Sequence, residues 1–159
     1  MLATERLGSI TGRGTVAEEK RKFDLSVVTP DGPAFEGEAE MVIVPGAAGE
    51  IGVLARHAPL IATLKAGSTR VYLNRDTQDV REYATGPGFF KVEQDRAIAL
   101  VDDAVLANEI DDARAQAQLE EAQQELERVE RGESSADRWQ LEQRIKHAEN
   151  QLQVSGRGQ

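Results

Sequence analysis

The stretch that decides the fold is residues 97–132, AIALVDDAVLANEIDDARAQAQLEEAQQELERVERG, because the apolar pattern changes its period within it. Up to Asp103 the chain has short apolar runs broken by turn residues, whereas Gly and Pro are then absent until Gly132. Most of the apolar positions that follow are three or four residues apart, as on one face of an α-helix. They are Ile110, Ala113, Ala117, Ala122, Leu126 and Val129. The sequence therefore predicts a boundary after Asp103 and a first helix over residues 104–131.

A second helix is predicted after the glycine. Gly132 is suited to end the first helix in a left-handed conformation, and Ser134 with Asp137 is typical of a capping box. Helical spacing then continues through Leu141, Ile145, Ala148 and Leu152. Two helices with so short a connection run antiparallel. We therefore expect a C-terminal antiparallel two-helix hairpin at residues 104–154 and a disordered tail at residues 155–159.

Residues 23–103 show the pattern of β-structure. Phe23, Leu25 and Val27 alternate with other residues in the period of two that a half-buried strand requires. Further β-like runs, separated by Gly, Pro, Asn or Asp, are residues 41–44, 60–64, 69–73, 80–83, 89–92 and 97–101. Short strands at this spacing predict an N-terminal antiparallel β-sandwich, a flattened barrel of about ten strands. Residues 1–22, rich in Gly, Ser, Thr and charge, are predicted to be a flexible arm.

Composition excludes several classes of function. The chain has no cysteine, which rules out disulfides and Cys-bound zinc, and its net charge of −9 argues against nucleic-acid binding. No apolar run approaches the ~20 residues of a membrane span, so direct membrane insertion is not expected. His57 and His147 lie far apart without metal-ligand spacing, and no P-loop or Rossmann fingerprint occurs. The sequence thus predicts no metal and no catalysis by the chain alone.

Three segments, taken in order, point to a family. VTPDGP follows the first strand at residues 28–33, GEIGVL leads into RHAPL over residues 49–60, and IDDARA opens the first helix at residues 110–115. In this order and at this spacing they resemble the epsilon subunit of F-type ATP synthase over about residues 23–154. GPGF at residues 86–89 is a looser match to the family's Gly-Gly-Phe turn. Residues 1–22 lie outside the usual pattern.

The resemblance implies a non-catalytic subunit of the rotor's central stalk. Its β-sandwich would couple the gamma subunit to the ring of membrane c subunits in a proton- or sodium-translocating motor. Its hairpin would leave the catalytic head free when folded on the β-domain. When extended along gamma it would reach the alpha/beta head and block ATP hydrolysis. Without an import signal, the implied place is the cytoplasmic side of a bacterial plasma membrane, as a peripheral protein.

The resemblance also implies contact residues. Glu50 and His57 would lie in loops that face the c ring or gamma. Each also has a local explanation, because Glu50 can be a solvated turn acid and His57 can bond backbone in the turn that Pro59 fixes. On the second helix the candidate inhibitory contacts with an acidic partner surface are Arg138, Arg144 and Lys146. Neighbouring acids offset these charges, so we expect inhibition driven by charge alone to be modest.

A further implied site is one for ATP. Positions that help to bind ATP in some family members correspond here to Ile110, Asp111, Arg114 and Ala115. An Asp can accept from the adenine amino group, and an Arg can bind phosphate oxygens through two hydrogen bonds. The same residues also suit an ordinary helix start, in which Asn108 caps the helix and Asp111 pairs with Arg114.

The chain departs from the strong ATP binders at three positions. Where they carry further arginines, this sequence has Glu121, His147 and Gln151. An acid opposite a triphosphate repels it, so we expect no cofactor and weak regulatory binding of ATP at most. Two other functions remain open from the sequence, namely a free-standing β-sandwich adaptor with a coiled-coil tail and a small nucleotide-sensing module.

Overall fold

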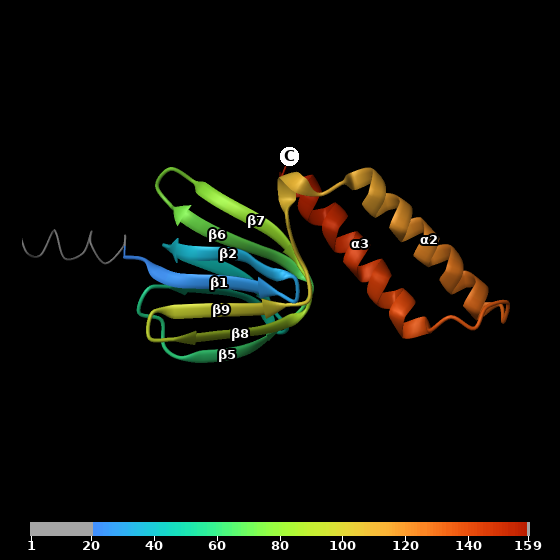
Figure 1. Cartoon of the computed structure of the whole chain (residues 1–159), viewed down its shortest axis with the longest axis horizontal. Helices are drawn as coiled ribbons and strands as arrows, with labels where there is room; N and C mark the ends of the chain where they lie inside the picture. The colour runs from blue at the N-terminus through green and yellow to red at the C-terminus, as the bar shows by residue number, and fades with distance from the viewer. Residues whose placement is uncertain (1–20, 159) are drawn as a thin grey trace, which may run out of the picture.

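The computed structural model describes residues 21–158, with side chains described up to residue 156, so all but the last two residues of the expected arm lie outside it. The described chain forms a β-domain followed by two helices (Figure 1). The strands are β1 (Phe23–Thr29), β2 (Gly32–Ala39), β3 (Met41–Gly46), β4 (Gly49–Leu54), β5 (Leu60–Leu64), β6 (Gly67–Asn74), β7 (Asp79–Thr85), β8 (Gly88–Glu93), β9 (Arg96–Val101) and β10 (Ala104–Leu106). The short 3-10 helix η1 (Ala107–Glu109) then leads to α2 (Asp112–Glu130) and α3 (Arg138–Gly158).

The ten strands form one hydrogen-bonded sheet that folds over on itself. Its order is β10-β7-β6-β3-β5-β8-β9-β1-β2, with β4 paired to β3, and β2 contacts β6 across the fold. The predicted sandwich of about ten strands is therefore confirmed. Its strand pairs are antiparallel with one exception, since β1 runs parallel to β9 from the pair Asp24 and Arg96 to the pair Val28 and Leu100.

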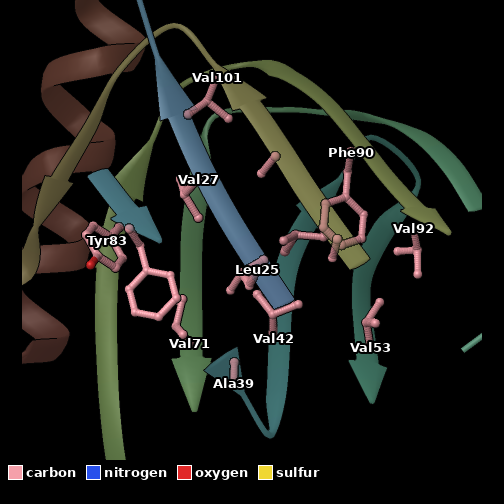
Figure 2. Packing of buried hydrophobic residues seen from close by; sticks show 14 of the residues in the cluster. Leu25, Val27, Ala39, Val42, Val53, Val71, Tyr83, Phe90, Val92 and Val101 are labelled. Carbon is pink, nitrogen blue, oxygen red and sulfur yellow. The ribbon is translucent and has the colours of Figure 1, made fainter. Parts of the chain in front are cut away.

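The core lies between the two halves of the folded sheet (Figure 2). The alternating residues of β1 point into it, and Phe90 from β8 lies within it with no exposed surface. Burying one such side chain contributes about 1.5–3 kcal/mol. The cluster comprises Phe23, Leu25, Val27, Phe35, Ala39, Val42, Val44, Val53, Leu64, Val71, Tyr83, Phe90, Val92, Ala97, Ala99 and Val101.

Three strands were not predicted from the sequence. β2 and β4 contain several Gly and charged residues and show little alternation, so only their pairing with β1 and β3 reveals them. Residues 104–106 were predicted to begin the first helix, and this was wrong. They form β10, which pairs with β7, because Ala104 and Leu106 pack against the β-domain core.

The first helix begins later than predicted. α2 starts at Asp112, and the residue that caps it is Asp111 rather than Asn108, which lies in η1. The Asp111 side chain accepts a hydrogen bond from the backbone N–H of Arg114 at 3.1 Å. The predicted phase of its inner face is also wrong at the start, because Ala115 and Ala122 are buried while Ala113 and Ala117 are exposed.

The second helix differs from its prediction at both ends. Asp137, not Ser134, caps it by accepting from the N–H groups of Trp139 and Gln140, while the Ser134 hydroxyl donates to Glu125. The predicted tail at residues 155–159 is wrong up to Gly158, since α3 continues that far. The reason is that Val154 and Ser155 are both buried. Gln159 lies outside the described residues.

The helices form the predicted antiparallel hairpin, and α3 lies between α2 and the β-domain (Figure 1). The buried residues of the two helices are Ala115, Ala122, Leu141, Ala148, Val154 and Ser155. Three of them are alanines, each of which buries little more than one methyl group, worth about 0.8 kcal/mol. The hairpin is thus held far more lightly than the β-domain.

Candidate functional site

The hairpin docks on the β-domain through a contact that includes side-chain hydrogen bonds. α3 packs against β7, β6 and η1. The Asn150 side-chain amide donates to the carbonyl oxygens of Gly67 at 3.1 Å and Thr85 at 3.2 Å. Near the end of the helix the Ser155 hydroxyl donates to Asp112 at the start of α2. The two hydrogen bonds of Asn150 therefore join α3 to the β-domain, whereas that of Ser155 joins α3 to α2.

Charged groups flank this contact. His147 Nε2 lies 3.5 Å from Asp103 Oδ2 and 3.1 Å from Gln151 Nε2. Burial raises the pKa of the neighbouring Asp102 carboxyl, Asp103 raises that pKa further, and His147 partly lowers it. A groove of about 480 Å³ runs beside these residues, with Lys65 and Lys146 on its walls. The docking surface thus contains both signs of charge.

Two of the four candidate ATP-binding residues, Asp111 and Ala115, make contacts within the hairpin. The Asp111 carboxylate caps α2, and the Ala115 side chain is buried with 1% exposed. Arg114 is exposed, and Ile110 is half-buried after η1. These contacts support the reading of the segment as a helix start, which sequence analysis gave as the alternative.

The positions where ATP binders carry further arginines are also occupied by other contacts. Glu121 lines a groove between the helices, which Arg144 also borders. His147 and Gln151 contact each other, and His147 lies beside Asp103. At these positions the hairpin therefore presents the carboxylate of Glu121 and the contacting side chains of His147 and Gln151, where a nucleotide site would need cations.

Glu50 and His57 do not lie together. Glu50 is the second residue of β4 and pairs with Pro45 of β3, so it does not lie in a loop. Its carboxylate accepts a hydrogen bond from the Arg70 side chain at 2.6 Å. His57 follows the other end of β4, and its Nδ1 lies 2.7 Å from the Ala58 carbonyl oxygen. A six-residue strand spans about 20 Å. One flat partner surface at an end of the sandwich cannot touch both residues.

An exposed apolar face on the β-domain was missed in the sequence. Ile61 on β5, Phe89 on β8 and Leu100 on β9 are 75%, 62% and 49% exposed. They share the outer face because Phe90 points into the core and Phe89 pairs with Leu100 in the ladder. The alternation in residues 89–92 could have indicated that one of the two adjacent phenylalanines points outward. Large exposed apolar side chains gathered on one face are typical of an interaction site.

The three candidate inhibitory cations point to different surroundings. Arg138 forms ion pairs with Glu142 at 3.0 Å and Glu130 at 3.4 Å. Arg144 borders the groove between the helices, whereas Lys146 borders the groove beside the β-domain. Trp139, which sequence analysis did not single out, is 66% exposed in the first turn of α3. An exposed Trp beside an Arg is a combination enriched at protein interfaces.

None of the described helices is long and apolar enough to span a membrane, and within the same residues no group of His, Asp or Glu could hold a metal ion. Residues 22–107 match the family model described as ATP synthase, Delta/Epsilon chain, beta-sandwich domain. That match covers the whole β-domain up to the start of η1.

Relatives extend the match into the hairpin. The ATP synthase epsilon chain of Rubrobacter xylanophilus is 34% identical over 145 residues, covering 89% of this chain and 97% of the relative. The epsilon chain of Bacillus cytotoxicus is 37% identical over 135 residues, covering 85% and 97%. Among solved structures, the Euglena gracilis mitochondrial ATP synthase (OSCP/F1/c-ring) contains a chain with a TM-score of 0.67 and 23% identity, covering 81% of this chain and 78% of that one. The central stalk and c ring of the Tetrahymena thermophila enzyme contain another, with a TM-score of 0.53 and 12% identity, covering 88% and 98%.

Proposed function

The chain belongs to the ATP synthase epsilon-chain family, and from this premise we propose that it joins the gamma subunit to the c ring and regulates ATP hydrolysis through its hairpin. It is a non-catalytic subunit of the complex. We place the complex in a bacterial plasma membrane, with this subunit peripheral on the cytoplasmic side. The observation that carries the proposal is the family match over the β-domain together with the exposed apolar face on that domain.

The apolar face is the surface that we assign to gamma. Ile61, Phe89 and Leu100 expose large side chains on three adjacent strands. Water contact of such side chains is unfavourable, by about 25 cal/mol for each Å² of apolar area. A partner that stays bound through rotation would cover them permanently. The aromatic ring of Phe89 would be the central anchor of this interface.

Because Glu50 and His57 lie at opposite ends of β4, we assign them to different partner subunits. The groove next to His57 is lined by Pro59, Leu60 and Ile61, so this end of β4 is continuous with the apolar face. We therefore assign His57 to gamma and Glu50, at the opposite end of the strand, to the c ring. Single cysteines placed at the two positions in separate variants should cross-link to different subunits. Cross-linking of both to the same subunit would contradict the assignment.

The hairpin is the regulatory element in this proposal. In its docked position it lies against β6 and β7, where it leaves the catalytic head free. Released from there, it would bring Arg138, Arg144 and Lys146 to the alpha/beta head, with Trp139 as an added apolar anchor. We expect no tightly bound nucleotide to govern this motion, because Asp111 and Ala115 are used within the hairpin and Glu121 places a carboxylate in the groove that Arg144 borders. Calorimetric titration of the chain with ATP should show no saturation at micromolar concentration.

The gamma contact is tested by replacing the anchor of the apolar face. Phe89→Asp should abolish co-purification with gamma, because an unpaired carboxylate would be buried in the interface. Trp139→Asp is the matched control, since Trp139 is also a large exposed apolar residue, 66% exposed, but lies on α3 outside this face. It should leave gamma binding intact. Retained binding of Phe89→Asp, or a self-dimer formed through the helices in place of a gamma complex, would favour a free-standing adaptor instead.

A further inference from the structure

We propose that Asn150 is the latch that holds the hairpin on the β-domain, a positioning role that rests on the proposed regulatory function. It is the residue of α3 whose side chain bonds directly to the sandwich at two points. Removing its amide group shifts the hairpin toward the released position without disturbing either the β-domain or the helices.

The geometry of the contact makes one side chain bridge two strands. Gly67 and Thr85 are directly opposite each other in the ladder between β6 and β7. An amide –NH₂ has two protons, so Asn150 can satisfy both carbonyl oxygens at once, at 3.1 and 3.2 Å. The last rung of the ladder and the middle of α3 are thereby joined.

The acceptors themselves are held in place. A Cβ atom on Gly67 would lie 2.7 Å from the Pro45 side chain, so the backbone there is packed directly against β3. The Thr85 side chain is 1% exposed, and its hydroxyl lies 2.8 Å from that of Thr69. Because both carbonyl groups belong to rigid backbone, the position of the Asn150 amide fixes the position of the helix.

The latch has a polar neighbour in the same contact, because His147 on α3 lies 3.5 Å from Asp103. On release, water replaces the Asn150 amide at both carbonyl groups, so the net strength of each hydrogen bond is small. A latch of this kind holds one defined position and remains reversible.

The latch can be tested in the free chain with a buried thiol. Ala84 on β7 points away from the core, since its neighbour Tyr83 belongs to the core cluster, yet it is only 3% exposed where α3 packs on that strand. The chain has no other cysteine, so the modification rate of Ala84→Cys reports how often the hairpin leaves. Adding Asn150→Asp keeps the shape, removes both donors and faces the carbonyl groups with a charge. The rate should rise roughly tenfold or more.

A matched control separates the latch from the added charge. Gln140→Glu makes the same change of charge on an exposed residue of the same helix that does not line the groove against the β-domain, and it should leave the modification rate unchanged. Asn150→Ser, which carries no new charge, should still raise the rate. Equal rates in Asn150→Asp, Asn150→Ser and the parent, with helix content preserved by circular dichroism, would overturn the proposal.

Hydrolysis by the assembled enzyme distinguishes this inference from the function on which it rests. With Asn150→Asp, ATP hydrolysis should fall, because a released hairpin reaches the head more often. Truncation after Ile110, which keeps β10 and η1 and removes both helices, should relieve that loss. If the thiol rate rises and hydrolysis does not change, the latch stands and the regulatory function fails. If truncation alters hydrolysis while the thiol rates stay equal, the function stands and the latch fails.

Discussion

The β-domain and the hairpin are two regions of one chain that are held together in different ways. The β-domain buries large side chains such as Leu25, Leu64 and Phe90, so opening it would expose a wide apolar area. The hairpin fully buries mainly small side chains, and the two hydrogen bonds of Asn150 join it to the β-domain. The difference teaches that rigidity and mobility can be distributed along a sequence by the size of the buried residues.

The largest change in stability is expected from a substitution in the core of the β-domain. Phe90→Ala should lower the free energy of unfolding by about 3–5 kcal/mol, because it removes a large buried ring and leaves a cavity. Urea unfolding followed by circular dichroism measures the change. Phe89→Ala, next to it but on the outer face, should cost far less. A loss below about 1 kcal/mol for Phe90→Ala would show that the core is not the rigid part.

The hairpin should respond more weakly and locally. Leu141→Ala removes the largest buried side chain between the helices and should cost about 2 kcal/mol, the low end for such a change. Hydrogen exchange should become faster in α2 and α3 and stay constant in the β-domain. Trp139→Ala, two residues away and exposed, should change little. Faster exchange throughout β1 to β9 would mean that the two regions unfold as one unit.

The helix caps sharpen the comparison further. Asp137→Ala should destabilise α3 by about 1 kcal/mol, because the N–H groups of Trp139 and Gln140 lose their acceptor. Asn108→Ala should have almost no effect, since Asn108 lies in η1 and does not cap α2. Exchange rates of the first-turn amides check both variants. A larger effect at Asn108 than at Asp137 would contradict the observed caps.

The smallest expected effect is the pH dependence of Tyr83. Burial raises the pKa of its hydroxyl above 10.0, and Arg81 partly lowers it. The Tyr83 hydroxyl therefore ionises at a lower pH in the unfolded chain than in the folded one, so its contribution to stability is constant below about pH 10 and is lost as the pH rises further. Absorbance titration of a Tyr72→Phe variant follows Tyr83 alone. A midpoint at or below 10.0 would show that the hydroxyl is not shielded.

Much of the β-domain could be predicted because its signal is local. The alternation of Phe23, Leu25 and Val27 records which face of β1 is buried, and the break after Asp103 marks the change from strands to helices. β2 and β10 could not be predicted in the same way. Their residues have little local preference for a strand, and they form one because a neighbouring strand offers free backbone groups.

The candidate site was less predictable than the fold. The motif at residues 110–115 is recognisable in the sequence. The sequence alone does not reveal that Asp111 caps α2 or that Ala115 is buried. The separation of Glu50 from His57 follows from the course of β4, which was not predicted. Asn150 carries no sequence signal, since its two acceptors are backbone carbonyl groups far away in the chain.

The parallel pairing of β1 with β9 has a consequence for synthesis on the ribosome. β1 is made first, yet one of its two neighbours is complete only when Val101 has emerged. Closure of the sandwich must therefore wait for nearly the entire domain, which is slow for contacts so distant in the chain. The two helices are translated last and arrive at a surface whose final rungs have just formed. The β-domain is thus complete before the hairpin can dock on it.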